Sequence, residues 1–154
     1  MIPFDIIGAL RTAAQAKGWA FLFGSSWIQN YEASQNEYQD GQLILGVDFD
    51  ASPIRYGGKV SEINYAGTMI LGRKFDPVPD TDPSLSTANL DETDIQKYDR
   101  RLLDLTTELS DFINEFSCSS QLTVTGENMR LDLNKFDTNI DFIANSLTFI
   151  GDGA

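Results

Sequence analysis

The sequence predicts a single α+β domain that contains a helix, an antiparallel β-meander, a long helix packed on the sheet and a C-terminal β-hairpin. Two segments carry apolar residues at helical spacing, and the segments between and after them are rich in β-type residues. The 154 residues are 42% hydrophobic and 11% aromatic. A chain of this length and composition can bury one core, so we expect residues 1–154 to form one domain.

The first helix is expected at about residues 3–17, where Pro3 suits the first turn and Gly18 suits the end. Its apolar face is formed by Phe4, Ile7, Leu10, Ala13 and Ala14. The next segment, WAFLFGSSWIQNYEAS, is apolar and aromatic without a helical period. We expect it to be a strand bent at Gly24, and we expect a loop in the polar segment SQNEYQDG.

Two strands of the meander are expected in QLILGVDFD and KVSEINYAGTMILGRK, which should pair antiparallel. The segment between them, ASPIRYGG, carries Pro53 and the pair Gly57-Gly58, and it is expected to be the connection. The segment FDPVPDTDPSLSTANL then predicts a Pro-rich surface loop at about residues 75–90. This loop is a candidate assembly arm.

The second helix is expected at about residues 91–116, with Asp91 as its N-cap. One stripe contains Ile95, Tyr98, Leu102, Leu105, Leu109, Phe112 and Phe116. Packing on a sheet is favoured over a coiled coil, because fewer than about four heptads are present. Strands are expected in QLTVTG, MRLDLNKF and DFIANSLTFIG, the first two forming one strand interrupted at Gly126.

The charge balance is strongly acidic, with 23 acidic and 11 basic residues, a formal charge of -12 and a pI near 4.1. Proteins bind phosphate backbones through Lys and Arg, so we expect neither tight nucleic-acid binding nor docking on anionic lipid. The sequence has no basic signal region and no apolar run of about 18 residues. We therefore expect a soluble protein that is made in a cytoplasm.

Catalytic chemistry is not expected. The chain has no histidine, and its one cysteine, Cys118, is expected to be a small buried residue rather than a nucleophile. A hydrolase could use carboxylates such as Asp48, Asp50 and Glu62, and this would require them to converge in a pocket. We predict no enzyme activity, no catalytic residue and no cofactor.

A calcium loop is an alternative for Asp137, Asn139 and Asp141, which are spaced two residues apart. An EF-hand would need Gly at the sixth position and Glu at the twelfth, where this chain has Phe142 and Thr148. We therefore expect no metal site. The three residues are interpreted as the polar edge of a strand whose Ile140 and Phe142 point inward.

The aromatic residues are candidates for contacts between subunits, because Trp and Tyr are enriched at interfaces. The alternative is the packed core of a monomer. The chain is expected to form a homo-oligomer, with interface candidates Trp19, Trp27, Tyr31, Tyr56 and Phe75.

The element order resembles that of the tail terminator and related neck or tail-completion proteins of long-tailed bacteriophages. The resemblance covers most of the chain and rests on element order, not on a diagnostic motif. The matching segments are FDIIGALRTAAQAKG, QLILGVDFD, KVSEINYAGTMILGRK, DIQKYDRRLLDLTTELSDFINEF and FDTNIDFIANSLTFIG. The family is non-enzymatic, so the resemblance implies no catalytic residue.

The resemblance implies a virion structural protein that forms a ring, usually a hexamer, at the head-tail junction or tail end of a phage. Its partners would be other virion proteins, such as the tail tube or the head-tail connector. Asp137 and Asp141 would then be candidates for an acidic rim that repels DNA or for a subunit contact. The alternative is a small monomeric or dimeric adaptor or ligand-binding α+β module.

Overall fold

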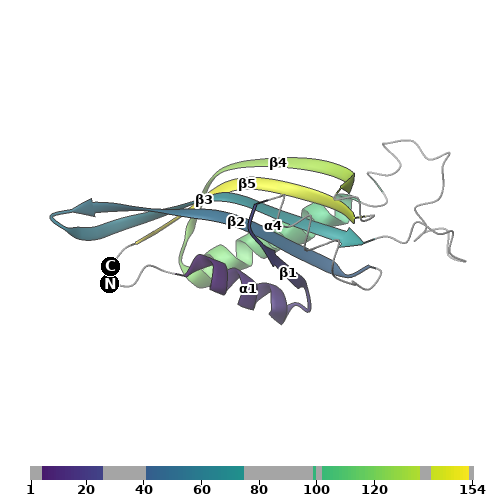
Figure 1. Cartoon of the computed structure of the whole chain (residues 1–154), viewed down its shortest axis with the longest axis horizontal. Helices are drawn as coiled ribbons and strands as arrows, with labels where there is room; N and C mark the ends of the chain where they lie inside the picture. The colour runs from purple at the N-terminus through teal and green to yellow at the C-terminus, as the bar shows by residue number, and fades with distance from the viewer. Residues whose placement is uncertain (1–4, 26–40, 75–98, 100–101, 136–139, 153–154) are drawn as a thin grey trace, which may run out of the picture.

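The computed structural model describes residues 5–25, 41–74, 99, 102–135 and 140–152 of the chain (Figure 1). In these residues, two helices pack on a five-stranded mixed sheet, which confirms the predicted α+β class. The elements in chain order are α1 (Ile6–Ala16), β1 (Ala20–Phe23), β2 (Leu43–Tyr56), β3 (Lys59–Lys74), α4 (Leu103–Ser120), β4 (Thr123–Lys135) and β5 (Ile140–Asp152).

The strand order in the sheet is β1-β2-β3-β5-β4. β1 runs parallel to β2, and every other neighbouring pair is antiparallel. The buried residues of both helices belong to one cluster with alternate residues of the central strands, such as Leu45, Met69 and Ile143. Both helices therefore cover the same face of the sheet, because alternate residues of a strand share a face.

Helix α1 begins at Ile6, three residues later than Pro3 would place it. The physical reason is the N-cap Asp5, whose Oδ1 accepts a hydrogen bond of 2.9 Å from the Gly8 amide. At the other end, Gly18 adopts a φ of 75°, and the Trp19 amide donates to the Ala14 carbonyl. The predicted stop at Gly18 is thus confirmed.

The β2–β3 hairpin is longer than the sequence predicted. The segment ASPIRYGG was expected to be a connection, but β2 continues through Tyr56 and the turn contains only Gly57 and Gly58. Both glycines have positive φ, 58° and 80°, as a two-residue type I′ turn requires. Pro53 lies inside β2. This part of β2 is an edge of the described sheet, where a residue without an amide hydrogen is tolerated.

Helix α4 begins at Leu103 and ends at Ser120, followed by Gln121 in the left-handed conformation. Residues 91–98, including the expected N-cap, lie outside the described residues. The described part of the predicted stripe is buried, and Ile113 joins it. Cys118 is exposed on this helix, so the expectation of a buried cysteine was wrong.

The last two strands pair as a hairpin. Gly126, with a φ of 64°, lies where the register shifts between Thr125 and Asn128, so the predicted interruption of a single strand is confirmed. By contrast, the predicted strand after α1 ends at Phe23 in β1, and residues 26–40 lie outside the described part. The predicted Pro-rich loop also lies outside it.

Aromatic side chains join the helices to the sheet. The Phe112 ring lies 5.1 Å from the Trp19 ring, and the Phe116 ring lies 5.5 Å from the Phe149 ring, centroid to centroid. In a further pair, the ring centroids of Phe49 in β2 and Phe149 in β5 lie 5.7 Å apart. These separations are typical of favourable tilted or edge-to-face pairs, so the aromatic cluster fixes the helices against the sheet.

Candidate functional site

The structure describes two of the five predicted interface residues, Trp19 and Tyr56, and their environments differ. Trp19 is only 8% exposed and packs on Phe112, so it is a core residue and the prediction of an interface role is corrected. Tyr56 is 73% exposed at the end of β2. The other predicted interface residues, Trp27, Tyr31 and Phe75, lie outside the described residues.

The acidic-rim candidate Asp141 is fully buried, so it is not available for an exposed rim in this chain. Its side chain lies on the same face of β5 as that of Ile143, which belongs to the core under the helices. Phe142 on the opposite face is buried as well. Strand alternation separates two faces but does not tell which of them meets solvent. Asp137 lies outside the described residues.

The longest run of exposed residues among the described strands lies at the end of the β2–β3 hairpin. We call residues 51–61 the arm. Pairing between β3 and β5 ends where Glu62 lies opposite Asp152, so beyond this point the sheet has only two strands. All residues from 51 to 59 are exposed. Figure 1 shows the hairpin extending along the long axis, beyond the other labelled elements.

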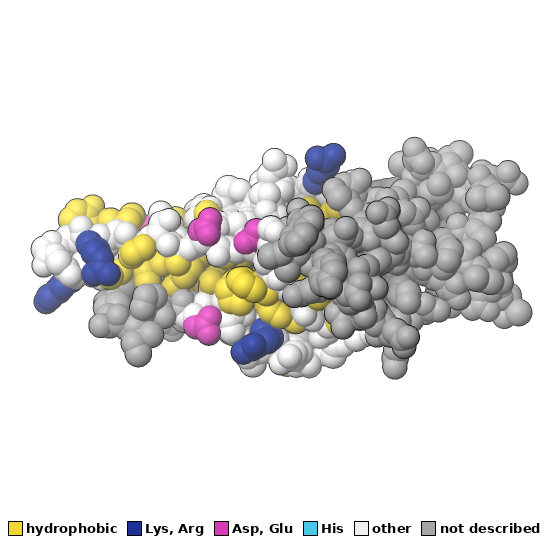
Figure 2. All heavy atoms as spheres, viewed as in Figure 1, with side chains coloured by type: hydrophobic (Ala, Val, Ile, Leu, Met, Phe, Trp, Pro, Cys, Tyr) yellow, Lys and Arg dark blue, Asp and Glu magenta, His cyan; other side chains and the backbone are white. Residues whose placement is uncertain are grey.

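The arm carries apolar and basic side chains together. Tyr56 and Ile54 are two of the exposed large hydrophobic residues, and Arg55 and Lys59 give the arm a formal charge of +2. The other 143 residues carry nine basic and 23 acidic residues, a formal charge of -14. Figure 2 shows dark-blue side chains at the end of the hairpin and a band of hydrophobic side chains continuing into the body.

The outer edge of β2 is protected against the addition of another strand. β1 pairs only with residues 44–47 of β2, and no described strand pairs with residues 48–56 on that side. This edge carries Asp48, Asp50 and Pro53. Charged residues and proline are common devices against edge-to-edge pairing, so the arm is suited to contacts through its side chains rather than its backbone.

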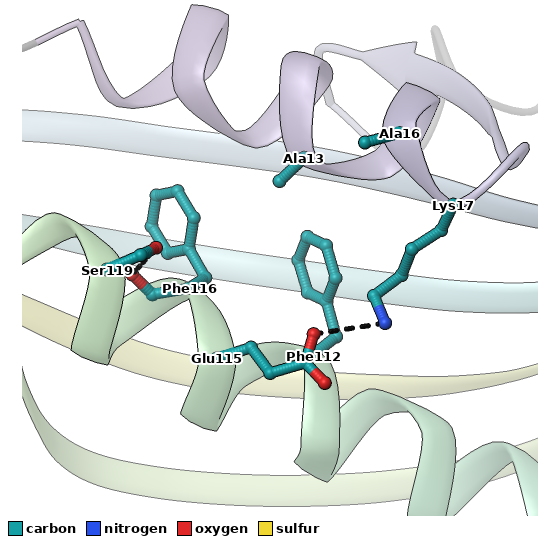
Figure 3. Close-up of a pocket in the computed structure, with 7 residues that line it drawn as sticks. All are labelled: Ala13, Ala16, Lys17, Phe112, Glu115, Phe116 and Ser119. Carbon is teal, nitrogen blue, oxygen red and sulfur yellow. Dashed lines mark hydrogen bonds and ion pairs between the residues drawn. The ribbon is translucent and has the colours of Figure 1, made fainter.

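A groove of about 380 Å³ lies between α1 and α4 (Figure 3). The rings of Phe112 and Phe116 point up from α4 into the space below the methyl groups of Ala13 and Ala16. The volume is at the low end for a ligand pocket, and its lining is mainly apolar. Phe112 and Phe116 are only 1% and 4% exposed, so little of either ring meets the groove. The residues that line the groove are Ala13, Ala16, Lys17, Phe112, Glu115, Phe116 and Ser119.

One margin of the groove is acidic. Glu115 forms an ion pair of 3.1 Å with Lys17, whose Nζ also lies 5.7 Å from the centre of the Trp19 ring. Asp111 and Glu108 precede Glu115 by about one and two turns on the same side of α4. Both are exposed, and neither forms an ion pair with a described residue. The margin therefore keeps negative charge after Lys17 is counted.

The described residues do not assemble a set of catalytic groups at either place. Asp48 and Asp50 lie exposed on β2, and Glu62 lies opposite Ile54, about 13 Å along the strand from Asp50. Within the described ranges, no group of three His, Cys, Asp or Glu side chains is placed to hold a metal ion. The carboxylates considered for a hydrolase are thus spread along an open face.

No protein-family model matches the sequence, and no curated protein matches it. Among the described residues, no helix is long and apolar enough to cross a membrane. The functional interpretation therefore depends on the chemistry of the arm and the groove.

Proposed function

We propose that this protein is a non-enzymatic virion structural subunit that assembles with copies of itself into a ring at the head-tail junction or tail end of a long-tailed bacteriophage. The phage context comes from the resemblance in element order. The ring is usually a hexamer in the family that the chain resembles. Other virion proteins, such as the tail tube or the connector, would be its partners.

The observation that carries the proposal is the arm. A two-stranded ribbon is marginally stable by itself, and this one exposes Tyr56 and Ile54 to solvent. Aromatic residues that project from a folded body are typical of the anchors that dominate protein interfaces. In a single subunit, the exposed Tyr56 ring contributes little to folding, so its contribution is expected in an assembly.

The acidity of the chain is consistent with a ring through which DNA passes. A channel lined by negative charge repels phosphates and allows the duplex to move. We expect the full-length protein not to retard duplex DNA in a gel even at low salt, where electrostatic binding is strongest. Retardation that disappears with added salt would contradict this part of the proposal.

Self-assembly is tested by sedimentation velocity on the full-length chain over a range of concentrations. A species with a mass near six subunits is expected to increase with concentration at the expense of the monomer, by mass action. A single species of monomer mass up to the highest concentration, including concentrations found in virions, would contradict the proposed ring.

A second candidate function is a small adaptor or ligand-binding module, and the α1–α4 groove is the observation that favours it. A volume of about 380 Å³ with an apolar floor could hold a small ligand. This alternative predicts a monomer or dimer by light scattering, together with a rise in melting temperature on adding a small apolar compound. A ring of constant mass with no such rise would exclude it.

A further inference from the structure

We infer that the end of the arm of one subunit binds in the α1–α4 groove of a second copy of the chain. The inference rests on the proposed ring and adds the contact that would hold neighbouring subunits together. Its central element is Tyr56, the large hydrophobic side chain with the greatest exposed fraction among the described residues.

The arm of a subunit does not reach its own groove. The paired positions Tyr56 with Lys59 and Ile54 with Glu62 keep the hairpin extended, and Figure 1 shows it pointing away from the two helices. The protruding end and the groove are therefore separate surfaces of one chain. A contact between them must involve two subunits.

The groove has the chemistry that a tyrosine ring requires. The methyl groups of Ala13 and Ala16 line the groove above Phe112 and Phe116, whose rings are only 1% and 4% exposed (Figure 3). A docked tyrosine ring would therefore cover mainly the alanine methyl groups, an apolar surface that leaves water on contact. The exposed Ser119 at the margin offers the tyrosine hydroxyl a polar neighbour.

The charges of the two surfaces are complementary. Arg55 and Lys59 lie beside Tyr56 at the end of the arm. Asp111 lies one turn before the groove residue Glu115, on the same side of α4. Exposed ion pairs contribute little affinity each, but they set the orientation and exclude wrong partners. The second copy is the occupant that this complementarity favours, because the rest of the chain has a charge of -14.

Such a contact is head-to-tail, since one subunit supplies the arm and the other supplies the groove. Heterologous contacts of this kind generate a ring when the rotation closes and a filament when it does not. The same surfaces would therefore give a ring or a filament rather than a symmetric dimer, and the proposed ring requires that the rotation closes. Each subunit would use both surfaces once.

A disulfide experiment tests the contact in the full-length chain. In a Cys118→Ser background, one preparation carries Lys59→Cys, at the exposed position paired with Tyr56 across the turn, and a second carries Ser119→Cys. The two are mixed under mild oxidation, and Tyr56 is kept in both. We expect a disulfide between the two introduced cysteines, identified by mass spectrometry of the linked peptides. The control replaces Ser119→Cys by Leu103→Cys, another exposed position of α4 outside the groove.

The expected rate of cross-linking is at least about tenfold higher with Ser119→Cys than with Leu103→Cys, because docking raises the effective concentration. Equal rates, or cross-links only between identical preparations, would overturn the inference. These outcomes leave the proposed ring intact if the mixture still sediments as a ring.

Charge reversal gives an independent readout with a matched control. Arg55→Glu is expected to weaken self-association about tenfold, and Asp111→Lys in the same chain should restore part of the loss. Arg11→Glu makes the same change at an exposed position of α1 outside the groove, and it should alter self-association less than about twofold.

The outcomes separate the two proposals. If the wild-type chain forms a ring and Arg55→Glu behaves like Arg11→Glu, the contact is wrong and the ring stands. If the wild-type chain remains a monomer at every concentration, the ring is wrong and the contact is wrong with it.

Discussion

The two ends of the β2–β3 hairpin belong to the same pair of strands but have opposite environments. In the body, Leu45 and Val47 of β2 and Met69 of β3 are fully buried under the helices. In the arm, every residue from 51 to 59 is exposed. Strand pairing alone therefore does not create a core, and the body is stabilised by the layer of helices that covers it.

The body and the arm contribute differently to stability. Residues of the body should determine the free energy of unfolding, because their apolar surface leaves water on folding. Residues of the arm should hardly affect it, because their side chains remain in water in a single subunit. Four substitutions separate the contribution of the body from that of the arm.

The largest effect is expected in the body at Phe112. Its ring is buried between Trp19 and Phe116, so Phe112→Ala should lower the free energy of unfolding by about 3–5 kcal/mol. Urea denaturation measures this change. Leu103→Ala, at an exposed position of the same helix, is the control and should cost about 0.5 kcal/mol or less.

A smaller effect is expected at Gly67 in the sheet. A Cβ atom at this position would collide with the Asp48 carbonyl oxygen and would lie 2.7 Å from the Phe49 Cα. Gly67→Ala should therefore force β2 and β3 apart locally and cost about 1–3 kcal/mol, as overpacking does. An unchanged urea midpoint would show that the strands accommodate the methyl group.

The turn of the arm provides the third substitution. Gly58 has a φ of 80° and open space around its Cα, so Gly58→Ala introduces backbone strain of about 1–2 kcal/mol without a clash. Because the arm can open without unfolding the body, the urea midpoint should change little. Faster amide exchange confined to residues 51–61 is the expected result. A drop in the midpoint equal to that of Gly67→Ala would contradict the separation of arm and body.

The smallest effect on folding is expected at Tyr56. Its side chain is 73% exposed, so Tyr56→Ala should change the free energy of unfolding by less than about 0.5 kcal/mol at concentrations where the chain is a monomer. Under assembling conditions the same substitution should abolish the ring. A loss of stability comparable to that of Phe112→Ala would show that Tyr56 belongs to the core.

The pattern of apolar residues was sufficient to predict much of the fold. An element that packs one face on a core places apolar residues at its own period, about 3.6 residues in a helix and two in a strand. The long helix and the strands both show this pattern. The end of β2 was missed because Pro53 and the following glycines resemble a loop. Only the structure shows that this part of β2 is an edge, where a proline is tolerated.

The candidate site was less predictable than the fold. Tyr56 and Trp19 were both among the predicted interface residues. Composition could not tell that Phe112 covers Trp19, whereas no described residue covers most of Tyr56. Asp141 was placed on a polar edge because alternation does not reveal which face is solvated. The groove joins α1 to α4 across about 100 residues of sequence, and no local pattern contains that contact.

Amide hydrogen exchange as a function of protein concentration distinguishes an arm that binds another subunit from an arm that stays in water. We expect fast exchange at residues 51–61 in dilute monomer and clear protection when the ring forms. Protection should also rise at Ala16 and Lys17, the exposed groove residues at the end of α1. Exchange in the arm that is equally fast at every concentration, in a sample shown to contain the ring, would contradict the claim that the arm holds the subunits together.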